Sequence, residues 1–257
     1  MSILDYIGTD EVENNKRLRE IERMKRRMAG LKNIYRVLGY DVAQSVDYSA
    51  VVINEYDGLT HSIRHIQRME PNTEYPDQVH LILQLLKHSH IDCVCLDASG
   101  VGRPVLDMLR KEHIRPVGIV ISGGREATFK GRLWTVPKTD LVTTTILAFQ
   151  NNLIRIAKLP ETKILLNELN QYEITIAKNG HTGFSAPSGK HDDVIMALFL
   201  SIYSTLKLYR SSSFPLEDAK GFGGINLNEK QPLSHQELHD AAMMELRRRQ
   251  NAHIRRK

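Results

Sequence analysis

Four aspartates occupy places in the chain where an acidic side chain is unexpected. They are Asp41 within the strand-like run IYRVLGYDV, Asp97 at the end of IDCVCLD, and Asp192 with Asp193 at the start of HDDVIMALFL. A carboxylate inside or ending an apolar segment is costly to bury unless it is hydrogen-bonded, paired with a cation or bound to a metal ion. These four residues are therefore the first candidates for chemistry.

Taken singly, three of these aspartates have ordinary structural explanations. Asp97 fits a turn or helix cap, and Asp192 and Asp193 fit the first turn of a helix, where the helix dipole favours acidic residues. Asp41 is harder to explain, because GYDVAQSVDYSAVVI places a carboxylate where Val or Ile is expected. If the strand of Asp41 is central and the strand of Asp97 lies parallel beside it, both carboxylates meet near one end. A helix crossing that end would bring Asp192 or Asp193 to the same place.

Carboxylates gathered in this way indicate a divalent metal site. Three or four of them repel one another, so they stay ionised together only with cations between them. Hard oxygen ligands select Mg²⁺ or Mn²⁺ rather than zinc. Two such ions about 3.5–4 Å apart form the arrangement that hydrolyses phosphodiesters, one activating the attacking water and the other stabilising the leaving 3′ oxygen.

Basic side chains near this acidic cluster would hold a phosphate backbone. The candidates are Arg125, Lys130, Arg132 and Lys138 in the segment GGREATFKGRLWTVPK (123–138), and Lys190 beside the paired aspartates. We expect residues 123–138 to form a long loop, and a loop of this length is more often functional than average. The alternative is a surface loop whose charges are simply solvated. His191 could position water or phosphate, or serve only at the helix start.

The remaining pattern predicts the elements that position these residues. Short connections join three strands at 34–42, 49–56 and 61–69, which favours hairpins. The elements expected next are a helix from 78, a strand at 91–97, a helix at 101–112, a strand at 114–122, a helix at 139–152, a short strand LIRIA, a helix near Pro160, a hairpin around Asn179-Gly180 and an apolar helix at 191–209. This order predicts an α/β sheet with helices on both faces.

The two ends of the chain differ from the centre. Residues 1–33 are strongly charged with apolar residues at helical spacing, which predicts an amphipathic helix or arm. Residues 34–210 form the expected catalytic domain. Residues 211–257 predict a linker followed by a basic helix that begins with the capping box Ser234–Glu237 and ends in LRRRQNAHIRRK. That basic tail is either a solvated end or a non-specific DNA contact.

Composition and motifs exclude several classes. The chain has 257 residues, a hydrophobic fraction of 41% and a net charge of +5, which suit a globular protein. It shows no membrane span and no signal peptide, so we expect an intracellular protein with no membrane partner. Cys93 and Cys95 share one strand and cannot easily bridge. No G-x-x-x-x-G-K-[ST] occurs, which argues against a P-loop ATPase, and Gly100 with Gly102 fits a tight turn better than a dinucleotide site.

The order of elements and the acidic positions resemble the ribonuclease H-like superfamily, and more closely the nuclease domain of tailed-phage large terminase subunits. The segments that carry the resemblance are VLGYDVAQSVDYSAVVI (37–53), VCLDASGVGRPVLDML (94–109), VPKTDLV (136–142), NELNQYEI (167–174) and GKHDDVIMALFLSIY (189–203). The resemblance implies a mixed five-stranded sheet whose first three strands are antiparallel and the rest parallel. It also implies that Asp41, Asp97, Asp192 and Asp193 bind two catalytic Mg²⁺ or Mn²⁺ ions.

The function that the resemblance implies is endonucleolytic cutting of double-stranded DNA, specifically of concatemeric viral DNA during genome packaging in the host cytoplasm. A typical large terminase carries its packaging ATPase ahead of the nuclease, whereas about 33 residues precede the first strand here. Either the motor is a separate polypeptide, or the chain is a free-standing nuclease of the same superfamily. With a separate motor, we expect an ATPase subunit as partner, together with the small terminase and portal, and the helix at 1–33 docking onto that motor in trans. The alternatives are a Holliday-junction resolvase or transposase-like nuclease of the same fold, and a non-catalytic packaging adaptor.

Overall fold

The computed structural model describes residues 34–43, 47–176 and 182–210 of the chain. The helix expected at 1–33 and the linker and helix expected at 211–257 lie outside the described residues, as does the turn at Asn179-Gly180. The chain divides into two compact units, residues 1–205 and 206–257, and every candidate site residue belongs to the first. None of the described helices is both long enough and apolar enough to cross a membrane.

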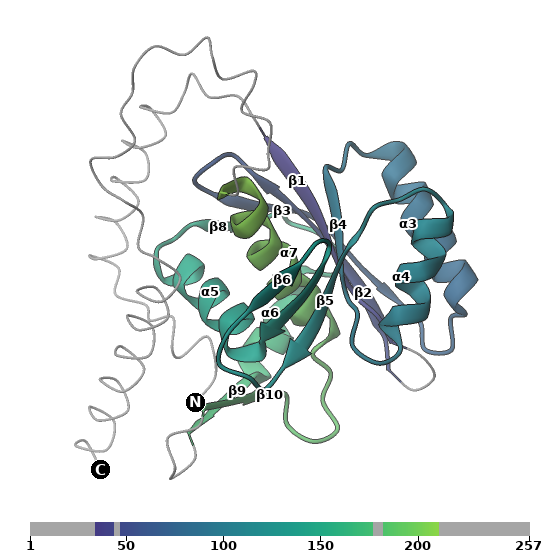
Figure 1. Ribbon diagram of the computed structural model, residues 1–257. Helices are drawn as coiled ribbons and strands as arrows, with labels where there is room; N and C mark the ends of the chain where they lie inside the picture. Colours follow the sequence, from purple (N-terminus) through teal and green to yellow (C-terminus); the bar gives the residue numbers. More distant parts are fainter. Residues whose placement is uncertain (1–33, 44–46, 177–181, 211–257) are drawn as a thin grey trace, which may run out of the picture. The chain divides into compact units, whose positions relative to one another are not determined.

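A mixed sheet forms the centre of the described part (Figure 1). In chain order its eight strands are β1 (Tyr35–Asp41), β2 (Ser49–Tyr56), β3 (His61–Met69), β4 (Cys93–Asp97), β5 (Val117–Ser122), β6 (Thr128–Lys130), β7 (Leu133–Pro137) and β8 (Ile154–Ile156). Across the sheet they lie in the order β6-β7-β5-β4-β1-β2-β3-β8. The first three strands pair antiparallel, and β4 and β5 follow parallel to β1, so the expected five-stranded mixed sheet is confirmed.

The sheet is wider than expected, and one prediction about it was wrong. Residues 123–138 are not one long loop, because β6 and β7 pair antiparallel within them and β7 extends the sheet beside β5. The physical reason is that β7 gains its hydrogen bonds from a strand outside its own segment, which a local pattern does not show. β8 pairs parallel with β3 and forms the far edge of the sheet. A separate hairpin, β9 (Glu173–Ile176) with β10 (Thr182–Ser185), confirms the pairing expected there.

Helices cover both faces of the sheet, as expected. They are α3 (Tyr75–His88), α4 (Gly102–Lys111), α5 (Lys138–Gln150), α6 (Thr162–Gln171) and α7 (Asp193–Arg210). Figure 1 shows α3 and α4 on one side of the sheet and α5, α6 and α7 on the other. Burial of apolar side chains on both faces stabilises this layered arrangement at about 25 cal/mol for each Å² removed from water.

Successive residues of β1 point alternately to the two faces of the sheet, one covered by α3 and α4 and the other by α7. Leu38 and Tyr40 belong to the core cluster that includes Val79 of α3 and Val105 of α4. Gly39 points the other way, since a Cβ atom built on it would lie 2.1 Å from the carbonyl oxygen of Ala197 in α7. The missing side chain of Gly39 therefore allows α7 to pack directly on the backbone of β1. Asp41 is two residues beyond Gly39 and shares its face.

The turn after β4 explains the glycines of DASGVG. Gly100 adopts a left-handed φ of 49°. A Cβ atom on Gly102 would lie 1.8 Å from the backbone oxygen of Asp97, so only glycine lets α4 start this close to the end of β4. The two glycines thus form the tight strand-to-helix turn expected from the sequence.

Candidate metal centre

Asp41 and Asp97 end neighbouring parallel strands. Tyr40 of β1 is in register with Leu96 of β4, so the next residue of each strand is an aspartate, and both are half-buried. The Sγ of Cys95, two residues before Asp97, donates to the carbonyl of Leu200 in α7 at 3.3 Å. Both aspartates therefore project from the sheet face that α7 covers.

Helix α7 brings the second acidic pair to the same edge. Ala197 lies on Gly39, and Asp193 is one helical turn before Ala197, which places it beyond Gly39 toward Asp41. Asp193 is buried in the first turn of α7, whereas the side chain of Asp192 is 33% exposed. The structure thus gathers the four predicted aspartates at the carboxyl ends of β1 and β4.

Glu168 of α6 is a fifth carboxylate at this place, and its role was not predicted. It is buried, and its Oε2 accepts a hydrogen bond of 2.8 Å from the backbone N–H of Ile195 in the first turn of α7. Its other oxygen, Oε1, is buried and has no hydrogen-bond partner among the described residues. Burial is the main cause that raises the pKa of Glu168 to about 8, and the charges of Asp193 and Asp192 raise it further. The sequence signal was the stretch NELNQYEI, in which one glutamate sits at the buried edge of a helix.

Arg68 of β3 was also missed. Strand register aligns Asp41 with Ala50 of β2, and Ala50 with Arg68, so the three residues form a row across one face. The Nε and Nη2 of Arg68 donate to Oδ2 of Asp193 at 3.1 and 2.6 Å. Its guanidinium also stacks on the ring of Tyr48, with Cζ 3.6 Å from the ring centre. No local pattern in HSIRHIQRM distinguishes Arg68 from Arg64, so only the pairing of strands reveals it.

Lys138 supplies the second cation. It begins α5, and its Nζ lies 3.8 Å from Oδ2 of Asp192 and 5.6 Å from the ring centre of Tyr172. Its charge also lowers the pKa of Asp97. Of the five predicted DNA-binding residues, Lys138 is the one in direct contact with the acidic cluster.

The carboxylates act on one another electrostatically. Burial raises the pKa of Asp41 well above its usual range, and the charges of Asp97, Asp193, Asp192 and Glu168 raise it further. Burial also raises the pKa of Asp97, although hydrogen bonds from Ser99 oppose this; the Ser99 N–H donates to Oδ1 of Asp97 at 2.7 Å.

Opposing effects also act on the pKa of Asp193. Burial raises its pKa, and hydrogen bonding and charge from Arg68 lower it. Two cations, Arg68 and Lys138, thus face five acidic groups in this cluster.

The chemistry of this donor set fits hard divalent cations. All five acidic groups offer carboxylate oxygens, and the buried Oε1 of Glu168 lacks a partner. In the arrangement described here, however, no three His, Cys, Asp or Glu side chains are gathered tightly enough to hold an ion. The physical reason is that like charges separate, and Asp193 and Asp192 instead turn to Arg68 and Lys138.

The other predicted basic residues lie apart from this cluster. Lys190 is exposed in the loop before Asp192, and Arg125 is exposed in the segment after β5, on the carboxylate side of the sheet. Lys130 pairs with Leu133 at the beginning of β7, and Arg132 precedes that strand. Because β7 runs parallel to β5 and β4, Lys130 and Arg132 stand at the opposite end of the sheet from Asp97. Arg132 instead joins a second basic cluster.

No protein-family model matches the sequence, and no curated protein matches it. The structure is similar to the large terminase nuclease from thermophilic phage G20c, with 21% identity, a TM-score of 0.52 and coverage of 67% of this chain and 82% of that chain. That nuclease has also been solved with bound magnesium and with bound cobalt. The Thermus phage P74-26 large terminase nuclease domain is similar at 20% identity and a TM-score of 0.51, covering 67% of this chain and 80% of that chain.

A longer protein, the large terminase of another thermophilic bacteriophage, is 10% identical with a TM-score of 0.52, covering 67% of this chain and 40% of that chain. The chain therefore has the fold of the large terminase nuclease domains of thermophilic phages, which confirms the ribonuclease H-like architecture expected from its sequence.

Proposed function

We propose that this chain is a metal-dependent endonuclease that hydrolyses phosphodiester bonds of double-stranded DNA with two metal ions. The observation that carries the proposal is the group of five carboxylates on four elements, in which burial, and then the charges of the other four, raise the pKa of Asp41. Perturbed carboxylates grouped in this way are typical of functional sites. A purely structural cluster would have no need of so much uncompensated charge.

Charge balance favours two ions. If bound cations kept all five carboxylates ionised, Arg68 and Lys138 would offset two of the five charges and leave a deficit of three. Two divalent ions together with one phosphodiester would bring the site to neutrality. When bound, such ions supply an activated water and stabilise the leaving 3′ oxygen. Asp41 and Asp97, which end adjacent parallel strands, would be among the residues that hold these ions.

Other residues of the chain have supporting parts. Glu168 holds the first turn of α7 through the N–H of Ile195, and its buried Oε1 has no hydrogen-bond partner among the described residues. Lys138 offsets the charge of Asp192 at the more exposed side, where a DNA phosphate would approach. Hard oxygen donors favour Mg²⁺ or Mn²⁺. The magnesium bound by the G20c nuclease supports the same choice.

The similar phage proteins support a role in genome packaging. We infer that the enzyme cuts concatemeric viral DNA, and that it works with a packaging ATPase, a small terminase and a portal. The described residues contain no helix-turn-helix motif for reading bases, which favours cutting with little sequence preference.

Cleavage of supercoiled plasmid with Mg²⁺ or Mn²⁺ tests the proposal. We expect nicking and linearisation by the wild type, and at least about a 100-fold loss in Asp97→Asn, Asp192→Ala and Glu168→Gln, because each removes a ligand or its charge. Asp77→Asn is the matched control, since Asp77 is exposed in the first turn of α3 on the other face of the sheet.

Equal cleavage by the wild type and the three site variants would contradict the carboxylate assignment. The preferred DNA substrate distinguishes a packaging endonuclease from a resolvase. A preference for four-way junctions over linear duplex would favour a resolvase. Absence of cleavage by every protein, with metal present, would contradict an autonomous nuclease and favour the adaptor.

A further inference from the structure

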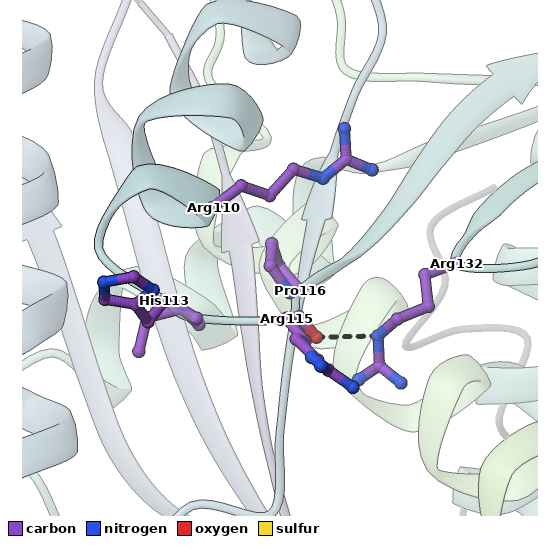
Figure 2. Close-up of a pocket in the computed structure, with 6 residues that line it drawn as sticks. Arg110, His113, Arg115, Pro116 and Arg132 are labelled. Carbon is purple, nitrogen blue, oxygen red and sulfur yellow. Dashed lines mark hydrogen bonds between the residues drawn. The ribbon is translucent and has the colours of Figure 1, made fainter.

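A second cluster of basic residues lies at the end of the sheet opposite the carboxylates. A cavity of about 310 Å³ opens there, lined by Arg110, His113, Ile114, Arg115, Pro116 and Arg132 (Figure 2). These residues come from the end of α4, from the connection between α4 and β5, and from the turn between β6 and β7. We call these six residues the distal basic pocket.

The charge of this pocket is largely unopposed. Arg110 pairs with Asp107 at 3.1 Å, but both side chains are well exposed, and such pairs contribute little. Within the described ranges, His113, Arg115 and Arg132 form no ion pair. Guanidinium groups gathered without acidic partners repel one another, and an anion shared between them relieves that repulsion. The pocket is therefore suited to a phosphate.

Two features show that the pocket is built rather than a chance gathering of surface charges. The Nε of Arg132 donates to the backbone carbonyl of Arg115 at 2.7 Å, which fixes one guanidinium beside the other segment (Figure 2). His113 adopts a left-handed φ of 62° where α4 ends, with its N–H bonded to the carbonyl of Arg110. Glycine is the usual residue at that position of a helix end, so an imidazole there is held at some cost in backbone strain.

Strand β7 connects this pocket to the carboxylates. Arg132 precedes the strand and Lys138, whose Nζ lies near Asp192, follows it. Six residues of extended chain span about 20 Å, which corresponds to about 6 base pairs of B-form DNA. The outer edge between them carries further positive charge, because Lys130 is exposed on β6 and Arg125 is exposed before it.

We propose that the distal basic pocket binds backbone phosphates of the duplex substrate about 6 base pairs from the bond that is cut. The proposal rests on the proposed nuclease function and adds to it a second, sequence-independent contact. Such a contact would hold the duplex along the β6–β7 edge and orient one strand toward Asp41 and Asp97. The alternative occupant, an acidic segment of a partner protein, is an outcome of the test.

Binding of fluorescent duplexes, measured by anisotropy in Ca²⁺ and an Asp97→Asn background, tests the pocket. For a duplex of about 30 base pairs, we expect the double variant Arg115→Gln/Arg132→Gln to bind about tenfold more weakly. We also expect the slope of log Kd against log salt to fall by about 2, because each lost phosphate contact removes about one unit. The control Lys87→Gln/Lys111→Gln removes the same charge from exposed positions outside the pocket and keeps the slope.

Duplex length gives the sharper measurement. A hairpin duplex of about 4 base pairs spans about 14 Å and is too short to engage both sites, so the double variant and its background should bind it equally. That equality also shows that the variant is folded. If the slope of log Kd against log salt is unchanged for the long duplex, the proposal is overturned and an acidic protein segment is left as the occupant. An equal loss of affinity for the long and the short duplex overturns it as well.

The two proposals fail separately. If the wild type cuts plasmid with Mg²⁺ but the double variant binds long duplex normally, the pocket proposal alone is wrong. If the wild type does not cut while the double variant loses affinity only for the long duplex, the phosphate contact stands and the nuclease proposal is wrong.

Discussion

At the scale of single residues, Arg68 is the unexpected member of the site. It neutralises Asp193 through two hydrogen bonds to one oxygen, with only 18% of its side chain exposed. A buried carboxylate left without a partner costs more than the pair itself contributes. Arg68 therefore serves as a resident counter-charge for Asp193, and a divalent ion would compete for the same carboxylate.

The variant Arg68→Gln tests this role. In EDTA we expect its free energy of unfolding to fall by about 3 kcal/mol, because Asp193 is left charged and buried. Added Mg²⁺ or Ca²⁺ should stabilise the variant more than the wild type, since the ion then binds Asp193 without displacing an arginine. Urea unfolding with and without the ion measures both effects.

Arg64→Gln is the matched control, because Arg64 lies on the same strand in an exposed pair with Glu55. The free energy of unfolding of Arg64→Gln should fall by less than about 1 kcal/mol, and this fall should not depend on the ion. A loss in Arg68→Gln that is the same with and without the ion would show that Arg68 only supports the fold.

At the scale of elements, the site depends on how closely α7 approaches β1. Gly39 has no side chain between its strand and the backbone of Ala197, and Cys95 of the next strand donates directly to Leu200. The apolar residues of α7 are buried, so the helix is held by packing along its length. Glu168 then fixes its first turn through Ile195. Together these contacts set the position of Asp192 and Asp193.

The variant Gly39→Ala tests the packing of α7. Its Cβ meets backbone atoms, which cannot move independently, so we expect a loss of about 3 kcal/mol in the free energy of unfolding. Where the variant stays folded, cleavage should fall about 100-fold, because a shift of α7 moves two carboxylates by about 1 Å.

Gly123→Ala is the control, since no atom lies within 4 Å of the added Cβ. Thermal unfolding and plasmid cleavage, measured on both variants, separate stability from catalysis. Wild-type cleavage by folded Gly39→Ala would mean that the position of α7 tolerates displacement.

At the scale of the whole molecule, stability should depend on pH through a group far from the reaction. His61, the first residue of β3, is buried beside β2, where Asn54 Nδ2 donates to its Nδ1 and also to Oγ1 of Thr205 in α7. Burial lowers the pKa of His61 to about 3. The folded state therefore keeps this imidazole neutral at pH values where the unfolded chain, with a pKa near 6.5, takes up a proton.

Because the pKa of His61 is lower in the folded state than in the unfolded chain, a fall in pH destabilises the folded state. The stability that depends on neutral His61 is complete above about pH 6.5 and is lost progressively as pH falls toward 3, by about 1 kcal/mol per pH unit. In His61→Gln this loss should disappear, so the difference in free energy of unfolding between wild type and variant should shrink by about 2 kcal/mol between pH 6.5 and 4.5.

Urea unfolding over this pH range measures the difference. His80→Gln, which replaces an exposed histidine of α3, should run parallel to the wild type. A difference between wild type and His61→Gln that stays constant with pH would show that His61 is not kept neutral by the fold.

Much of this protein follows from its sequence alone. Alternating or continuous apolar runs predicted the first five strands and the helices between them, because burial of one or both faces imposes those periods. Asp41 and Asp97 were identifiable because a carboxylate in or at the end of an apolar strand conflicts with its surroundings. The adjacency of those strands was only a condition of the sequence argument, because β2, β3 and α3 separate β1 from β4 in the chain, and the parallel pairing of β1 with β4 fulfils it.

Tertiary structure alone decided the rest. Arg68 and Glu168 sit in ordinary amphipathic segments, and only two successive strand registers and the packing of α6 on α7 bring them to the carboxylates. The segment 123–138 became β6 and β7 because β5 offered it a free edge, and that placed Arg132 at one end of the sheet and Lys138 at the other. Local patterns record which face of an element is buried. They do not record what lies opposite that face, since contacts between residues distant in the sequence are fixed only when the chain closes on itself.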